Sequence, residues 1–490
     1  MNIEIFNPLV WTSLTPLLGV LVLFLIPSSN ESWCRLFSLW ISCVTFILSL
    51  LLWLQFDSNT SFFQYVSVFK WFPYSNFYYT TGIDGISLFF IILTSFLVII
   101  CILISWSSVQ TNLKDYLVCF LILEFFLIQV FSVLDIFLFY IYFESVLIPM
   151  FLIVGIWGSR QRKIRASYQF FLYTLIGSLL MLLGLLVIYY ETGSTDFRVL
   201  WCFRFSELKQ IVLWISFFAS FAVKIPMIPF HIWLPEAHAE APTAGSVILA
   251  GILLKIGGYG FLRFSLPMFP LASVFFTPAI FILSLIAVIY ASLTTLRQVD
   301  LKKIIAYSSV SHMGLVTMGV FSLNIQGLEG SVLLMLSHGL VSSALFFCAG
   351  ILYDRYKTRI IKYYSGLVQS MPLFGIVFLF FTLANMGFPG TSSFTGELLV
   401  LLGMFQVSTT LTFFSCVGVV LSASYSIWLF NRICFGVLKT EYIQLYQDIS
   451  RREFFILTPL VLLTLWIGVY PYSFLNEIHC SGMNLIDLIS

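Results

Sequence analysis

Long apolar segments follow one another along most of the chain, and they constrain its fold more than any other feature. Hydrophobic residues make up 60% of the 490 positions and charged residues only 9%, against about 45–50% and about 25% in soluble domains. A soluble domain could not bury so much apolar surface. The net charge of +2 provides no basic field for nucleic acid. The sequence therefore predicts an integral membrane protein and excludes a soluble enzyme, a nucleic-acid-binding protein and a disordered scaffold.

The apolar runs, each bounded by polar residues, predict about fourteen transmembrane helices in an all-α fold. They cover residues 8–26, 34–56, 85–106, 114–131, 134–157, 168–190, 210–230, 241–263, 271–295, 303–323, 328–353, 371–402, 409–434 and 455–475. The longest polar stretches, 57–84, 191–209 and 436–454, are too short to fold alone. We therefore expect one polytopic domain over 1–490, with four parts at 1–110, 111–265, 266–435 and 436–490.

Basic residues are distributed unequally between the two sides of this predicted topology. Loops that join odd to even helices carry 17 of the 24 Lys and Arg, and the opposite loops carry 5. Basic loops stay on the cytoplasmic or matrix side of a membrane, so both termini are expected on the opposite side. The first apolar run, Pro8 to Leu25, has no basic segment before it, which predicts a retained helix and not a cleaved signal.

Five charged residues stand out at mid-bilayer positions of predicted helices, where an ionised side chain costs about 2.5–3.5 kcal/mol. They are Glu124, Glu144, Lys224, Lys255 and Glu397. At any single site, a paired charge that only orients helices is an alternative. For the whole set this is implausible, because apolar replacements are often neutral or stabilising. Burial favours the neutral form of both carboxyl and amine groups, so such groups exchange protons readily. The set predicts a proton relay.

The histidines extend this pattern. His312 lies in AYSSVSHMGLVTMG and His338 in LLMLSHGLVSSALFF. Their Ser and Gly neighbours leave room for water, so both are candidate relay groups, with helix-linking hydrogen bonds as the alternative. His231 and His238 are seven residues apart, but a metal site there needs more ligands. His479 is expected at the surface. The nine cysteines form no C-x-x-C pair, which disfavours an iron–sulfur or zinc site.

Two predicted helices are interrupted. Helix 7 runs into KIPMIPFHIWLPEAHAEAPTAGS, whose prolines forbid a continuous helix, and helix 12 contains NMGFPGTSSFTGE. Interrupted helices five apart predict two inverted five-helix repeats, helices 4–8 and 9–13, as in transporters. The sequence contains no G-x-G-x-x-G after a strand and no P-loop. We therefore expect no cofactor and no metal in this chain.

One long segment carries a specific family resemblance. LPEAHAEAPTAGSVILAGILLKIGGYG, followed by LRQVDLKKIIAYSSVSHMG and LSHGLVSSALFF, resembles the antiporter-like membrane chains of respiratory complex I. The similarity extends from about Gly82 to Glu397, and more loosely to both ends. It implies a proton-translocating membrane-arm subunit of NADH:ubiquinone oxidoreductase. NADH oxidation and ubiquinone reduction in other subunits would then drive pumping through this chain.

The resemblance also implies a role for six residues. The family's helix-5 glutamate and helix-7 lysine, which form a proton-loading ion pair, fall on Glu144 and Lys224. The central relay lysine of helix 8 falls on Lys255. The polar positions of helices 10 and 11 and the charged position of helix 12 fall on His312, His338 and Glu397. No role follows for Glu124 or for Asp135, which is expected to be an interfacial charge.

The same resemblance implies the surroundings of the chain. FMN, iron–sulfur clusters and ubiquinone are expected in other subunits, and neighbouring antiporter-like chains, membrane lipids and protons are the expected partners. The implied location is the mitochondrial inner membrane, with both termini facing the intermembrane space. The 53 Phe residues point to an organellar gene. Two alternatives remain: a subunit of a multisubunit Na⁺/H⁺ antiporter, and a structural spacer without a working channel.

Overall fold

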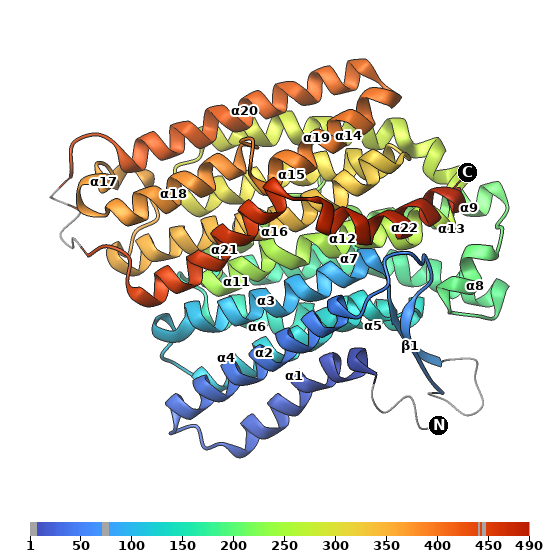
Figure 1. The fold of residues 1–490 in the computed structure, drawn as a ribbon, viewed down its shortest axis with the longest axis horizontal. Helices are drawn as coiled ribbons and strands as arrows, with labels where there is room; N and C mark the ends of the chain where they lie inside the picture. Colours follow the sequence, from blue (N-terminus) through green and yellow to red (C-terminus); the bar gives the residue numbers. More distant parts are fainter. Residues whose placement is uncertain (1–6, 71–77, 440–441, 443–446, 490) are drawn as a thin grey trace.

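Apolar helices run side by side through nearly the whole chain. The structure, a computed structural model, describes residues 7–70, 78–439, 442 and 447–489. The long helices are roughly parallel or antiparallel to one another, and α1 begins at the same end of the bundle at which α22 ends (Figure 1). This arrangement confirms the predicted helical membrane protein.

Helices and two short strands are the regular elements of the described part of the chain. They are α1 (Pro8–Leu25), α2 (Glu31–Leu54), β1 (Gln64–Lys70), β2 (Tyr78–Ile83), α3 (Gly85–Ser108), α4 (Leu113–Ser132), α5 (Ile136–Ser145), α6 (Leu147–Trp157), α7 (Lys163–Thr192), α8 (Phe197–Cys202), α9 (Glu207–Lys224), α10 (Trp233–Glu240), α11 (Thr243–Ile248), the π-helix η2 (Leu249–Leu253), α12 (Leu254–Gly260), the π-helix η3 (Phe261–Ser265), α13 (Leu266–Met268), α14 (Pro270–Arg297), α15 (Leu301–Phe321), α16 (Ile325–Tyr356), the 3-10 helix η4 (Ile361–Tyr363), α17 (Leu367–Ser370), α18 (Pro372–Asn385), α19 (Ser392–Val407), α20 (Thr409–Cys434), α21 (Arg451–Val469) and α22 (Tyr472–Ile489).

Twelve helical segments in the described part of the chain are long and apolar enough to cross a membrane. The predicted number was about fourteen, and the difference lies in the two interrupted helices. α9 is not among the twelve because its 18 residues include three charged side chains, Glu207, Lys209 and Lys224. Predicted helix 12 is not among them because it is divided into α18 and α19, which have only 14 and 16 residues. The count of fourteen and the inverted repeats remain predictions.

Both interruptions lie where prolines and glycines place them. α9 ends at Lys224, and the chain turns through Pro226 and Pro229 before α10 begins. Between α18 and α19, Gly387 and Gly390 have φ values of 75° and 90°. Glycine adopts such positive values without the steric penalty of other residues. Backbone hydrogen bonds from Met227 to the Ala222 carbonyl and from Phe388 to the Leu383 carbonyl satisfy part of the unwound backbone, whereas Phe230 and Phe388 are exposed.

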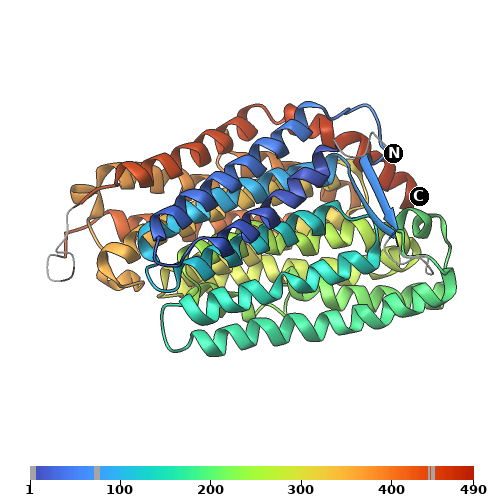
Figure 2. The same ribbon diagram turned by 90° about the horizontal axis from the view of Figure 1, so that it is seen from below.

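The middle of the bundle is formed by α16 and the continuous segment from α11 to α13. The most apolar 18-residue stretch of each is wholly buried, whereas in α7 only 39% is. α16 packs against α11, α15, α18, α19, α21 and α22. α1 and α2 lie side by side on one face (Figure 2). Polar residues on the central helices are therefore surrounded by protein and not by lipid.

A β-hairpin forms within residues 57–84, for which the sequence predicted only a polar loop. β1 and β2 pair antiparallel, with Ser67 opposite Thr81 and their hydroxyl oxygens 2.6 Å apart. The hairpin caps the end of the bundle at which α1 begins (Figure 1). Its connection, residues 71–77, lies outside the described residues. The sequence prediction missed it because a short two-stranded hairpin gains its stability from the helices beneath it.

Candidate functional site

Lys255 lies at the centre of the bundle, in the first turn of α12. It is fully buried, and its Nζ lies 2.8 Å from Nδ1 of His338 on α16. The same Nζ donates a hydrogen bond of 2.5 Å to the carbonyl of Ala250, in the preceding π-helix η2. π-Helical turns occur often at functional sites. Here the turn lies directly before the lysine.

A continuous row of polar side chains leads away from Lys255. The rings of His338 and His312 have centroids 5.7 Å apart. Nδ1 of His312 lies 3.1 Å from Oε1 of Glu397. His312, His338 and Glu397 are each 4% exposed. Four predicted residues from α12, α16, α15 and α19 therefore form one buried row, which we call the central row.

Small residues allow these helices to approach closely enough for the row to form. A Cβ atom on Gly339, next to His338, would lie 3.0 Å from the carbonyl oxygen of Gly251. A Cβ on Gly396, next to Glu397, would lie 2.9 Å from the backbone of Leu334. Small residues at helix interfaces in membranes permit such contacts. The glycines beside His338 and Glu397 thus bring η2 and α19 against α16.

Glu397 also borders the interruption in helix 12. A Cβ on Gly387 would lie 2.5 Å from its Oε2. A cavity of about 300 Å³ between α19 and α20 adjoins Glu397, Gly387 and Thr412. Apart from Glu397 and Thr412 its lining is almost wholly apolar, and Leu398, Leu402 and Phe405 are exposed on the surface of the bundle. The end of the central row therefore lies beside an apolar surface groove.

Glu144 and Lys224 are arranged differently. No ion pair within 4 Å joins them, although they are close enough to interact electrostatically. Nζ of Lys224 has no hydrogen-bond partner among the described residues and lies 4.4 Å from the centroid of the Phe143 ring. Glu144 is one residue before the end of α5, and Lys224 is the last residue of α9. Both side chains lie where a helix ends.

The other candidate residues lie outside the central row. Glu124 is fully buried on α4, and its Oε1 accepts a hydrogen bond of 2.5 Å from Thr45. Asp135 caps α5 by accepting hydrogen bonds from the backbone N–H groups of Phe137 and Leu138. His479 is exposed and lies 2.6 Å from Glu329.

Neither His231 nor His238 belongs to a metal-binding group. The structure contains no group of three or more His, Cys, Asp or Glu side chains suited to a metal ion, as far as it describes the chain. His231 lies beside Tyr290 and Tyr307. The ring of His238 stacks on that of Phe346.

Three charged residues at or just beyond the ends of predicted helices are also buried. Arg263 lies in η3, is 1% exposed and forms an ion pair with Asp84. Lys302, in the first turn of α15, is 2% exposed. Arg359 is 3% exposed and lies 3.4 Å from Glu240. The sequence gives little warning of this burial, because each of these residues flanks an apolar run, as loop residues do.

The fold and the central row together define an antiporter-like membrane chain. Residues 134–422 match the family model described as NADH:quinone oxidoreductase/Mrp antiporter, TM. Among solved structures, a chain of respiratory complex I from Thermus thermophilus has a TM-score of 0.90 at 29% identity, covering 98% of this chain and 100% of its own. A chain of the Mrp complex from Dietzia sp. has a TM-score of 0.88 at 19% identity, covering 99% and 98%, and shows the fold alone.

Relatives with much higher identity narrow this class. The NADH-ubiquinone oxidoreductase chain 4 of Chondrus crispus is 76% identical over 490 residues, which is the full length of both chains. That of Arabidopsis thaliana is 60% identical over 474 residues, covering 97% of this chain and 96% of its own. The chain belongs to the NADH-ubiquinone oxidoreductase chain 4 family. It is a proton-pumping membrane-arm subunit of respiratory complex I, as the sequence predicted.

Proposed function

We propose that Lys255, His338, His312 and Glu397 carry the pumped proton along the central row, and that Glu144 and Lys224 control its loading. The contact of 2.8 Å between Lys255 and His338 is the observation on which this proposal depends. An ammonium group can only donate a hydrogen bond, whereas a neutral imidazole can accept one. The contact can therefore hold the proton on either partner, which is the property that a relay requires.

The loading step uses the separation of Glu144 and Lys224. A signal from quinone reduction elsewhere in the complex changes their pairing, and Lys224 shifts its charge toward Lys255. The proton affinity of Lys255 then falls, and its proton passes to His338. The unpartnered Lys224 ammonium supports this step, because it has no hydrogen bond to break within the described part of the chain.

The later steps follow the row to its end. The rings of His338 and His312 have centroids 5.7 Å apart with no hydrogen bond between them, so the proton passes from one to the other through a bridging water. Glu397 receives it from His312 and releases it on the intermembrane-space side. Moving one charge against the membrane potential costs about 2.3 kcal/mol per 100 mV. A change of two units in the proton affinity of one group is worth about 2.7 kcal/mol, so it covers this amount.

The surroundings of the chain complete the proposal. It lies in the mitochondrial inner membrane, is encoded in the organelle, and has both termini in the intermembrane space. Neighbouring antiporter-like chains flank it, and lipids fill the remaining surface. FMN, the iron–sulfur clusters and ubiquinone are bound by other subunits. The division of 17 against 5 basic residues between the two sides supports this orientation.

Replacement of the central lysine tests the relay. In membranes containing the assembled complex, Lys255→Met should lower coupled NADH oxidation and proton pumping at least tenfold. Lys209→Met is the matched control, because that lysine is exposed and paired with Glu191. A native gel stained for NADH dehydrogenase activity reports assembly. Normal pumping by an assembled Lys255→Met complex would contradict the proposal and favour a structural spacer.

A further inference from the structure

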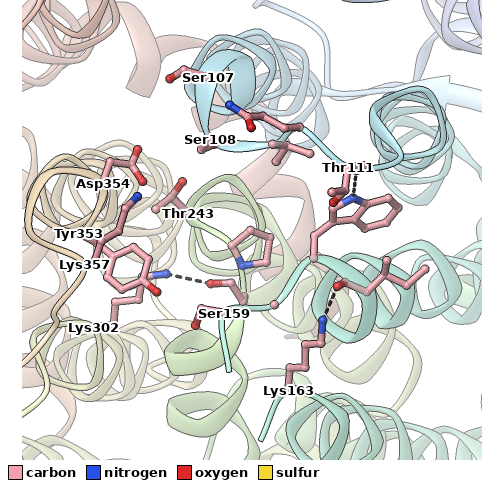
Figure 3. A pocket seen from close by; sticks show the side chains of 17 residues that line it. Ser107, Ser108, Thr111, Ser159, Lys163, Thr243, Lys302, Tyr353, Asp354 and Lys357 are labelled. Carbon is pink, nitrogen blue, oxygen red and sulfur yellow. Dashed lines mark hydrogen bonds between the residues drawn. The ribbon is translucent and has the colours of Figure 1, made fainter. Parts of the chain in front are cut away.

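Polar side chains gather at the basic end of the bundle, the end at which α2, α4, α15 and α21 begin. A cavity of about 680 Å³ lies there, and its border includes Lys163, Lys302, Asp354 and Lys357. Figure 3 shows Ser107, near the end of α3, on the rim of this cavity. Ser107 also lies at the end of a groove on the outside of the bundle.

α3 forms the floor of this groove, which we call the α3 groove. α2 and α21 both pack against α3, which lies between them (Figure 1). Half-buried apolar side chains recur along α3, at Ile92, Phe96, Ile99 and Leu103. The next position in this series is the exposed Ser107. Spacings of three and four residues place side chains on one face of a helix, so the floor is an apolar strip that ends in a hydroxyl group.

The α3 groove deepens into an apolar cavity near the middle of the bundle. The volume of this cavity is about 250 Å³, and α2, α3, α16, α21 and α22 line it with apolar and aromatic side chains. Its innermost side chains include Leu336 and Leu340 of α16, which are 4% and 3% exposed. His338 lies two residues from each of them, and such a spacing turns a side chain to the opposite side of a helix. The cavity and the central row therefore lie on opposite sides of α16.

Two arginines border the groove at its basic end. Nη2 of Arg452, at the start of α21, donates a hydrogen bond of 2.7 Å to Oγ of Ser107. Nη2 of Arg35, near the start of α2, donates to the carbonyl of Val109 at 3.4 Å and to Glu31 at 3.2 Å. Among the described residues, no other nitrogen of either guanidinium makes a hydrogen bond. Both cations are thus held at the end of the floor helix with N–H groups to spare.

The distance from the arginines to the apolar cavity matches one leaflet of a bilayer. Phe46 is the first cavity residue after Arg35, and Leu463 is the first after Arg452. Each is eleven residues further along its helix, a distance of about 16 Å. The hydrocarbon core of a bilayer is about 30 Å thick, so one leaflet contributes about 15 Å. An acyl chain whose headgroup lies at the arginines therefore ends in the cavity.

We propose that the α3 groove binds a phospholipid with an anionic headgroup. Arg35 and Arg452 bind the phosphate, and one acyl chain runs along α3 into the apolar cavity. Guanidinium groups form strong, often paired, hydrogen bonds with phosphate oxygens. Basic pockets between membrane helices on the cytoplasmic or matrix side bind anionic headgroups. Glu31 is the one carboxylate in contact with either arginine among the described residues, and its side chain is 49% exposed, so the two cations dominate the site.

Photolabelling in membranes that contain the assembled complex tests the occupant. The probe is phosphatidylglycerol with a diazirine near the end of one acyl chain, and mass spectrometry locates the adducts. We expect adducts on the α2 and α21 peptides that contain Phe46 and Leu463. Phosphatidylcholine with the same chain carries no net charge and should label these peptides at least fivefold less. Excess inorganic phosphate should not compete, because it has no acyl chain to bury.

Equal labelling by the two lipids would show that the headgroup charge is not recognised, and it would overturn the proposal. Absence of adducts with both lipids would show that protein covers the groove, and it would overturn the proposal as well.

Replacing the arginines tests the headgroup contacts. The double variant Arg35→Gln, Arg452→Gln should lower labelling by phosphatidylglycerol at least fivefold. Arg35→Lys with Arg452→Lys keeps both charges and should stay within twofold of wild type. Arg432→Gln is the matched control, because Arg432 is exposed in the last turn of α20, a helix that does not line the cavity. A native gel stained for NADH dehydrogenase activity reports assembly. Wild-type labelling of the assembled glutamine variant would contradict the site.

The lipid site is independent of the proposed relay. Lys255→Met should leave labelling within twofold of wild type, because Lys255 contacts His338 and the cavity lies on the other side of α16. A fivefold loss of labelling in Lys255→Met would contradict the site as placed here. Failure of the relay would leave the lipid site standing, and failure of the lipid site would leave the relay standing.

Discussion

The two charged regions of the bundle differ in how their side chains meet. In the central row, Lys255 contacts His338 at 2.8 Å, and His312 lies 3.1 Å from Glu397. In the loading region, Lys224 has no hydrogen-bond partner and no ion pair within 4 Å in the part of the chain that the structure describes. A row of contacts can pass a proton without moving a helix. The electrostatic interaction between the separated side chains of Glu144 and Lys224 changes with their distance. We expect the signal from quinone reduction to act by changing this distance.

Helix geometry explains the difference. The central row is held by two continuous helices, α15 and α16, and by η2 and α19, which pack on α16 through glycines. Lys224 is the last residue of α9, after which the chain turns through Pro226 and Pro229, and Glu144 lies next to last in α5, which Val146 joins to α6. Side chains at helix ends can shift with small backbone changes, whereas those in the middle of packed helices cannot.

The largest effect is expected from breaking the central row at its outer end. Glu397→Gln removes the carboxylate that accepts the proton from His312, and it should lower proton pumping at least tenfold. Fluorescence quenching of a pH-sensitive acridine in vesicles measures the pumping. Glu207→Gln changes an exposed carboxylate on α9 and serves as the control. Pumping at the wild-type rate in Glu397→Gln would mean that the row ends elsewhere.

Glu144→Gln tests the loading region. The uncharged amide can no longer attract Lys224, so we expect fewer protons pumped per electron while the complex assembles normally. Glu144→Asp keeps the charge on a shorter side chain and should have an intermediate effect. The measurement is the proton-to-electron ratio during NADH oxidation. An unchanged ratio with Glu144→Gln would remove this residue from the mechanism.

Phe143→Leu sharpens the comparison with a smaller change. The Phe143 ring lies beneath the Lys224 ammonium, and such a cation–π contact is worth about 0.5–2 kcal/mol. Its loss should change coupled turnover about threefold. Phe139→Leu is the matched control, because Phe139 is one turn earlier on α5 and equally buried. Equal effects of both substitutions would show that only packing was lost.

Glu124→Gln should have the smallest effect. Glu124 contacts Thr45 on α2 and not the central row, and a glutamine keeps an oxygen that accepts the same hydrogen bond. We expect pumping within twofold of wild type and normal assembly on a native gel. A tenfold loss of pumping would place a second proton path along α2 and α4.

Much of the fold was predictable because a bilayer permits few solutions. Apolar runs in a bilayer must be helices whose backbone hydrogen bonds are internal, so hydropathy alone predicted α1 to α4. The prolines and glycines of the sequence predicted the interruptions of helices 7 and 12. The β-hairpin at 64–83 was not predicted, because its polar and aromatic residues are equally typical of a loop. The burial of Arg263 was also missed, because its partner Asp84 lies 179 residues away in the chain.

The candidate site was predictable only in its residue types. Buried charges in apolar runs identified Glu144, Lys224, Lys255 and Glu397 as residues that packing alone would not retain, and the family resemblance gave them roles. The sequence could not give distances between them. His238 was weighed only as a metal ligand, because its stacking on Phe346 of α16 depends on how α10 packs in the bundle.

The sequence by itself determined that this chain is a helical membrane protein with interrupted helices and costly buried charges, because the energetics of apolar runs, prolines and ionised groups in lipid are local. Only the tertiary structure decided which charges touch, which stay apart and which face the cavity at the basic end. Those relations depend on how helices that are far apart in the chain pack together, and glycine contacts such as that between η2 and α16 set this packing.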